Sequence, residues 1–254
     1  MLPNNLKLKL EDVIEKNNLK DIQSLIFQAS EPCFSICIEE KEDYIAIGNS
    51  RIAGYPDLPP AIQWPVEDEY YYTFIAQINL SELPENNITF LPKKGIIYFF
   101  LGFDDMASDV DHKVLYYDGD LSMLKKTMPP EGKEGVDFEN RDFTAYKISF
   151  EEDISIASDS ETADLLFENN EDIYDMFCAG RDVLWGHPET IYGGNPCEEL
   201  DENGEQRWHL LLKLTSMDEV GMCWWDAGYL EFLIDVKCLS KLDFSKTHAC
   251  IETS

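Results

Sequence analysis

The sequence GYLEFL at residues 228–233 decides the fold, because a similar sequence, GIIYFF, stands at residues 95–100. Two further pairs occur in the same order. GYP at 54–56 corresponds to GHP at 186–188, and FIAQI at 74–78 corresponds to LLLKL at 210–214. The shifts are 133, 132 and 136 residues, and a nearly constant shift is typical of an internal repeat. We therefore predict a degenerate duplication.

Apolar and polar residues alternate with a period of two over most of the chain, which is typical of half-buried strands. This pattern predicts strands at residues 33–40, 43–48, 71–80, 95–102, 112–119, 143–150, 207–214, 228–234 and 246–252. Helical spacing instead predicts two short helices within residues 6–29, interrupted at Asn17 and Asn18. Residues 158–180 are predicted to be helical, with Ser160 as N-cap and Gly180 as the stop.

These elements predict an α+β protein, mostly antiparallel sheet in two similar halves, with N-terminal helices and a central helical segment. The strand pattern is continuous and contains no Gly/Ser linker, so we expect residues 1–254 to form a single compact domain. Within it we expect a helical lead-in at 1–30, a first half at 31–135 and a second half at 136–254.

The chain carries 50 acidic and 20 basic residues, a formal net charge of −30. Such a charge repels phosphate backbones and anionic lipid headgroups, which excludes nucleic acid and membranes as expected partners. A basic protein becomes the partner that electrostatics favours. The alternative is that the charge is only a solvated acidic coat, which keeps a protein soluble.

The first residues, MLPNNLKLKLEDVIEKNN, contain no basic region followed by an apolar run, so we expect neither a signal peptide nor a membrane span. A cytoplasmic location is the resulting prediction. The seven cysteines show no CxxC pair, and we expect reduced, mostly buried thiols.

Motifs that carry catalysis are absent from the sequence. The four histidines, His112, His187, His209 and His248, form no HExxH or nucleophile-elbow pattern, and no GxGxxG or Walker loop occurs. The sequence DDMASDVDH at 104–112 gathers oxygen ligands, but its spacing is not that of an EF-hand. We therefore expect no metal, no cofactor and no catalytic residue, and we favour a protein without enzymatic activity.

The sequence MCWWDAG at 222–228 is the best candidate for a binding site. Successive side chains of a strand point to opposite faces, so Trp224 and Trp225 cannot both face the core. With Asp226, the exposed ring would bind a cation through cation–π contact and a carboxylate. In the alternative, the tryptophans pack as core and Asp226 accepts backbone hydrogen bonds in a turn.

Several segments together resemble the YwqG-like bacterial proteins, a family of unknown function. They are SRIAGYPDLP near residue 50, FIAQINLSELP at 74–84, KGIIYFFLG at 94–102, KVLYYDG at 113–119 and MCWWDAGYLEFLI at 222–234. The resemblance covers roughly residues 45–246 and implies an α+β protein of two related halves, without implying any chemistry. Some similar proteins stand beside toxin systems, which implies an immunity role as one option.

This chain departs from the family pattern at two positions. The resemblance implies glutamine where Lys213 stands and glycine where Trp225 stands, whereas Trp224, Asp226 and Gly228 fit the pattern. Gln77, the first-half counterpart of Lys213, fits as well. The two departures imply that any polar site of the family is altered here.

Two function hypotheses follow. The first is a non-catalytic cytoplasmic interaction protein that binds a basic partner, with an immunity or antitoxin-like role as one option. The second is a small-molecule-binding protein or unrecognised enzyme with a ligand in the crevice between the halves. The candidate binding residues are Trp64, Gln77, Trp185, Lys213, Trp224, Trp225 and Asp226.

Overall fold

A ten-stranded antiparallel sheet organises the chain in the computed structural model, which describes residues 2–84, 89–136, 141–190, 194–201, 204–205 and 207–253. Its strand order is β15-β14-β13-β12-β1-β11-β2-β6-β7-β8. The strands are β1 (Glu31–Lys41), β2 (Arg51–Ile52), β6 (Thr73–Asn79), β7 (Ile96–Leu101), β8 (His112–Tyr117), β11 (Tyr146–Ser155), β12 (Val183–Gly186), β13 (Trp208–Thr215), β14 (Tyr229–Asp235) and β15 (Thr247–Glu252).

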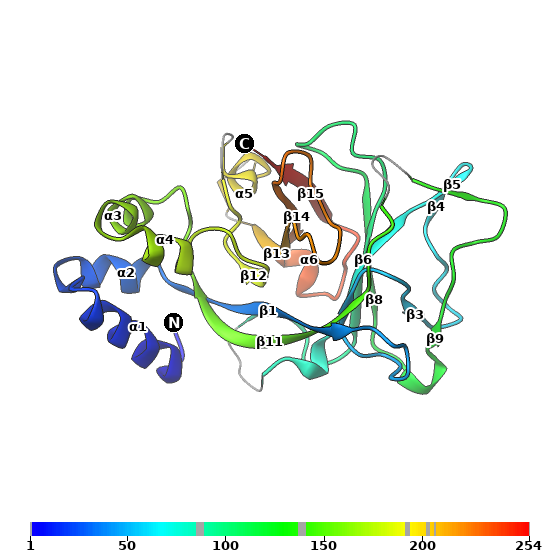
Figure 1. The fold of residues 1–254 in the computed structure, drawn as a ribbon, viewed down its shortest axis with the longest axis horizontal. Coiled ribbons are helices and arrows are strands. Elements are labelled where there is room, and N and C mark those ends of the chain that lie inside the picture. The colour runs from blue at the N-terminus through cyan, green and yellow to red at the C-terminus, as the bar shows by residue number, and fades with distance from the viewer. Residues whose placement is uncertain are drawn as a thin grey trace.

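The two edges of this sheet meet, so the sheet is nearly a barrel (Figure 1). Next to the edge strand β8, the backbone N–H of Val110 donates to the carbonyl of Ala249 in β15 at 2.8 Å. The N–H of Ile251 donates to the carbonyl of Ala107 at 2.7 Å. The segment 104–112, considered above for metal binding, therefore closes the sheet.

The interior of the curled sheet holds the largest hydrophobic cluster. Phe99 on β7 and Phe232 on β14 meet there with ring centroids 5.0 Å apart, although the two strands lie far apart in the strand order. The cluster draws buried residues from both ends of the sheet. Burying large aromatic side chains from opposite walls contributes much of the stability of such an interior.

Two small sheets and short loops cover the outer face of β6, β7 and β8. One pairs β3 (Asp57–Leu58) with β9 (Lys125–Lys126), and the other orders β10 (Glu134–Gly135), β5 (Tyr70–Tyr71) and β4 (Val66–Glu67). Beneath them, Trp64, Phe74 and Phe100 pack edge to face with centroids 5.5 to 6.5 Å apart. These covering strands escaped the sequence analysis because each has only two residues.

The helices gather at one end of the molecule, to the left in Figure 1. They are α1 (Asn4–Lys16), α2 (Gln23–Ala29), α3 (Glu161–Asn169) and α4 (Glu171–Phe177), with a cluster of buried apolar residues of their own. The break near Asn17 and the cap at Ser160, whose Oγ accepts from the Ala163 N–H at 3.1 Å, are confirmed. Short turns α5 (Pro196–Glu199), α6 (Val236–Leu239), η1 (Lys20–Ile22), η2 (Leu80–Glu82) and η3 (Leu121–Met123) complete the elements. No described helix is long and apolar enough to cross a membrane.

The mixed helix-and-sheet class and most predicted strands are confirmed, but the strand at 43–48 is wrong. Side chains satisfy the backbone there, because the N–H of Tyr44 donates to Glu42 and that of Ile45 to Asp43. Tyr44 also has a φ of 58°, which a strand cannot accommodate. The segment is therefore an ordered loop with local side-chain hydrogen bonds.

Gly228→Ala tests the contact between the start of β14 and its neighbour β15. A Cβ at Gly228 would overlap the carbonyl of Glu252, which is fixed in the ladder by pairing with Tyr229. We expect the free energy of unfolding, measured with urea, to fall by about 3 kcal/mol. Gly132→Ala is the control, because its φ of 75° costs only about 1 kcal/mol where no atom lies within 4 Å. Equal losses in the two variants would contradict the close approach.

Candidate functional site

A cleft of about 810 Å³ opens beside β6 and is the main candidate site. Its walls come from residues 41–55, from the covering strands and from residues 129–136 and 141–145. Six aromatic side chains line it: Tyr44, Tyr55, Trp64, Tyr71, Phe74 and Phe143. The charged lining residues are Lys41, Glu42, Lys133, Glu134, Arg141 and Asp142. This volume and aromatic character are typical of ligand-binding clefts.

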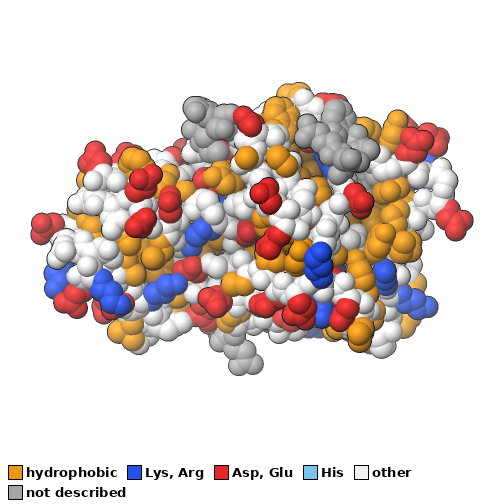
Figure 2. All heavy atoms as spheres, viewed as in Figure 1, with side chains coloured by type: hydrophobic (Ala, Val, Ile, Leu, Met, Phe, Trp, Pro, Cys, Tyr) orange, Lys and Arg blue, Asp and Glu red, His pale blue; other side chains and the backbone are white. Residues whose placement is uncertain are grey.

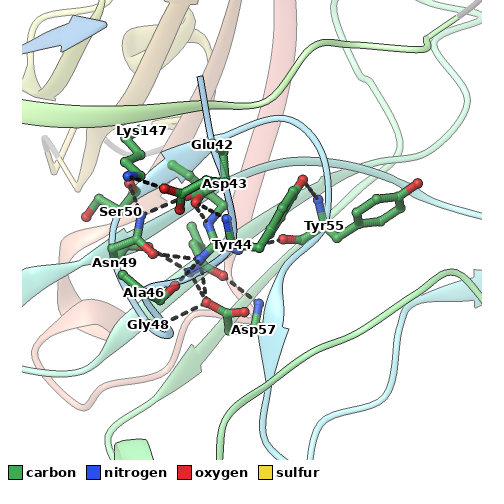
Figure 3. Close-up of polar contacts among 12 residues, drawn as sticks. Glu42, Asp43, Tyr44, Ala46, Gly48, Asn49, Ser50, Tyr55, Asp57 and Lys147 are labelled. Carbon is green, nitrogen blue, oxygen red and sulfur yellow. Dashed lines mark hydrogen bonds and ion pairs between the residues drawn. The ribbon is translucent and has the colours of Figure 1, made fainter. Parts of the chain in front are cut away.

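Arg51, which is fully buried on β2, organises the loop that forms one wall of the cleft. Its partners Glu42, Asn49, Tyr55 and Asp57 are labelled in Figure 3. Its Nε lies 3.0 Å from Glu42 and its Nη2 lies 2.5 Å from Asp57, and both carboxylates are fully buried. The guanidinium also donates to the Tyr55 carbonyl at 3.0 Å and to Asn49 Oδ1 at 2.7 Å. A planar fork of donors suits such a set of acceptors better than an ammonium would.

This network positions the tyrosine wall. The Tyr44 ring lies 5.1 Å from the Arg51 guanidinium, and the Tyr44 hydroxyl accepts from the Tyr55 N–H at 3.1 Å. The two rings then stand 5.9 Å apart at the cleft. Gly54, with a φ of 73°, leaves room for the Tyr44 hydroxyl where a Cβ would overlap it. The wall therefore depends on Arg51, which does not itself line the cleft.

Gln77, a predicted binding residue, belongs to the same network and is fully buried. Its side-chain oxygen accepts from the Asp57 N–H at 2.8 Å, and its amide donates to the Asn49 carbonyl at 2.7 Å. Tyr98 donates to the Asp57 carbonyl at 2.8 Å. Gln77 therefore holds the loop after β2 in place and is not among the cleft residues.

Lys213, predicted as its counterpart, is buried in a second polar cluster. Its Nζ lies 2.6 Å from Glu189, whose N–H donates to Glu231 at 2.7 Å. Complete burial raises the pKa of Glu231 to about 8. The buried ammonium group of Lys213 therefore forms an ion pair with Glu189 inside the fold.

The predicted tryptophans lie in different places. Trp64 lines the cleft and donates to the Tyr72 carbonyl at 2.8 Å. Trp185 is buried and stacks on His209 with centroids 3.9 Å apart. Trp224 is 2% exposed, Trp225 is 43% exposed and Asp226 is exposed. Of the seven predicted residues, Trp64 alone lines the large cleft.

Trp225 has a φ of 50°, the left-handed conformation that glycine adopts without strain. The resemblance implied glycine at this position, and the backbone geometry accounts for that preference. The expected division of the pair, one ring in the core and one accessible, matches the exposures of Trp224 and Trp225.

The predicted metal loop pairs with other parts of the chain. Asp104 lies 3.0 Å from Arg141, and the described residues contain no group of three or more His, Cys, Asp or Glu side chains arranged to hold a metal ion.

Two histidines unexpectedly share one acid: His209 Nε2 lies 3.2 Å and His187 Nε2 lies 3.8 Å from Glu31. The hydrogen bond with His209 lowers the pKa of Glu31 to about 2.

The cysteines are free thiols, but fewer of them are buried than expected. Cys33, Cys178 and Cys250 are buried, whereas Cys223 is exposed. Burial raises the pKa of the Cys33 and Cys178 thiols to about 12, which makes them poor nucleophiles.

Sequence reasoning missed most of the cleft. Tyr44, Tyr55, Tyr71 and Phe143 read as ordinary aromatic residues of strands and turns, and they converge only through the loops. A signal was nevertheless present at Arg51, because an arginine directly before an apolar pair and a Gly-Tyr-Pro turn has to find buried acceptors.

Comparison with known proteins gives a family without an activity. Residues 50–252 match the family described as Domain of unknown function (DUF1963). No curated protein matches the chain.

Glu231→Gln tests the buried carboxyl of the second cluster. Because the folded-state pKa is raised from 4.5 to about 8, folding favours the protonated form. This contribution is fully present below about pH 4.5 and is lost as pH rises to about 8, by at most about 1.4 kcal/mol per pH unit. Urea unfolding between about pH 5 and 8 should show a steeper loss for wild type than for the variant. The exposed Glu219→Gln should retain the wild-type slope, and equal slopes in wild type and Glu231→Gln would contradict the assignment.

Proposed function

This chain belongs to the DUF1963 family, whose function is unknown, and we propose that it is a non-catalytic binding protein whose cleft takes a basic segment of a partner protein. The observation that carries the proposal is the aromatic lining of the cleft beside β6. Aromatic faces attract ammonium and guanidinium groups, and the effect grows when the site excludes water.

The chain itself contains an example of this recognition. Lys126 on β9 places its Nζ 3.9 Å from the Tyr44 ring centroid and 4.9 Å from that of Tyr55. The same two rings line the cleft. The tyrosine pair is thus suited to hold a lysine ammonium group.

The charges at the cleft support a cationic ligand. Glu42 is paired with Arg51, and Arg141 is paired with Asp104. Lys133 donates to the Asp68 carbonyl and lies 3.8 Å from Glu69. The side chains of Glu134 and Asp142 have no basic partner within ion-pair distance in the described part of the chain. Lys41 has no acidic partner there either and lies over the Tyr146 ring at 5.9 Å. Two unpaired acids against one lysine leave a net negative charge at the cleft for a basic ligand.

The net charge of −30 would steer a basic partner toward the molecule but would not select one. Figure 2 shows Asp and Glu side chains spread over the visible face, with no single acidic patch. In this proposal the surface charge raises the association rate, and the cleft supplies specificity.

A small organic ligand is the second candidate. The volume of about 810 Å³ favours it, because pockets for small molecules commonly measure roughly 300 to 1,000 Å³.

Three further statements remain proposals: a cytoplasmic location, a closer relation to the YwqG-like proteins and an immunity role. The resemblance alone supports the last two.

Duplication of two halves is our interpretation of the fold. Supporting it, β12 to β15 follow one another outward from β1, as β2, β6, β7 and β8 do from β11. Ala53-Gly54 and Trp185-Gly186 are both left-handed pairs at the predicted shift. Both loops that follow are held by a backbone N–H donated to a buried side chain, from Asp57 to Gln77 and from Glu189 to Glu231.

The test is binding of a fluorescent pentalysine peptide, followed by anisotropy. We expect Glu134→Gln combined with Asp142→Asn to weaken binding about fivefold, since each exposed charge contact contributes roughly 0.5 kcal/mol. Binding should also weaken as salt rises from about 0.05 to 0.5 M.

The matched control combines Glu11→Gln with Glu168→Gln, two exposed acids on α1 and α3 at the helical end of the molecule (Figure 1). It changes the net charge by the same amount and should leave the affinity within about 1.5-fold of wild type. Equal weakening by both pairs, or no measurable binding, would reject the cleft as the basic-segment site.

A further inference from the structure

We propose that a small pocket adjoining the cleft is a subsite in which the indole N–H of Trp224 donates to an uncharged carbonyl oxygen of the bound segment. This inference deepens the proposed function and rests on it for the identity of the ligand. A peptide backbone supplies such a carbonyl at every residue. The subsite would therefore bind the main chain of the segment, while a basic side chain of the same segment enters the aromatic cleft.

The pocket measures about 40 Å³ and adjoins the cleft, because Arg141 and Phe143 line both. Trp224 and Trp225 form its other side, together with Cys223. A water molecule takes up about 30 Å³ in the liquid, so the pocket has room for one small polar group and not for a side chain.

Trp224 brings a buried donor that lacks an acceptor. Its side chain is 2% exposed, and its Nε1 has no hydrogen-bond partner in the described part of the chain. The rest of the residue is well held: its backbone N–H donates to Ser216 at 2.8 Å, and its ring packs edge to face on Phe143 with centroids 5.8 Å apart. A buried Trp N–H usually finds a partner, since leaving it unpaired is costly.

The charge beside the pocket favours a neutral acceptor. Arg141 lies 3.0 Å from Asp104, which also lines the pocket, and Arg141 donates to the Gly102 carbonyl at 2.8 Å. The guanidinium is thereby balanced, and a carboxylate entering the pocket would meet the Asp104 carboxylate as well. A carbonyl oxygen accepts from the indole N–H without this repulsion.

The experiment is a titration of protein labelled with ¹⁵N-tryptophan, followed by the indole N–H resonances. The probes are N-methylacetamide for a neutral carbonyl, acetate for a carboxylate and tetramethylammonium for a cation. The Trp224 resonance is identified by its proximity to the Phe143 ring and by its loss in Trp224→Phe. Trp208→Phe on β13 serves as the control, because Trp208 lines neither the pocket nor the cleft and the Trp224 N–H remains.

We expect N-methylacetamide to move the Trp224 resonance downfield with saturation, at a dissociation constant on the order of 10 to 100 mM for so small a probe. Acetate and tetramethylammonium should move it less, and the response should persist in Trp208→Phe. An unmoved Trp224 resonance, or a stronger response to acetate, would overturn the subsite.

The two proposals fail separately. If pentalysine does not bind but N-methylacetamide moves the Trp224 resonance, the subsite stands and the basic-segment function falls. If pentalysine binds with the expected dependence on Glu134 and Asp142 while the Trp224 resonance stays unmoved by either ligand, the cleft function stands and the subsite is rejected.

Discussion

The buried guanidinium of Arg51 is the constraint on which the rest of the site depends. A cation removed from water requires acceptors on all sides, and Glu42, Asp57, Asn49 and a backbone carbonyl supply them. Those partners belong to the segments on either side of β2. Satisfying one side chain therefore fixes the loop before the strand and the turn after it, and together these present the tyrosine wall of the cleft.

The second polar cluster solves a similar problem with different residues. There the cation is Lys213 on β13, and the carboxyl that accepts a loop N–H is Glu231 on β14. In the first cluster the cation is on β2 and the acceptor is Gln77 on β6. Under our interpretation of two related halves, the loop geometry was kept while the positions of charge and acceptor changed. Under our proposal, the aromatic cleft beside β6 is the feature that makes the first half the binding site.

Most regular elements were predictable because they depend on local periodicity and caps. The strands at β6, β7, β13 and β14, the helix break near Asn17 and the Ser160 cap follow from nearest-neighbour patterns. The near-closure of the sheet was not predictable, because it rests on backbone bonds between residues such as Val110 and Ala249 that carry no sequence signature. The cleft was missed for the same reason: two of its aromatic rings, Tyr44 and Tyr55, lie in loops whose course is set by Arg51. Trp224 and Trp225 were singled out correctly as an unequal pair, yet their setting beside Arg141 required the fold.

The measurement that tests the central claim most directly is pentalysine affinity in Arg51→Lys, beside the free energy of unfolding of the same variant. The substitution keeps the charge, removes the planar fork and changes no residue that lines the cleft. For Arg51→Lys we predict that the free energy of unfolding falls by about 3 kcal/mol. We also predict that the protein that remains folded binds pentalysine more weakly than wild type does. In Lys147→Met, which breaks a more exposed ion pair with Glu40, stability should change by less than about 1 kcal/mol and binding should be retained. A folded Arg51→Lys protein that binds pentalysine as tightly as wild type would contradict the claim that this buried network builds the site.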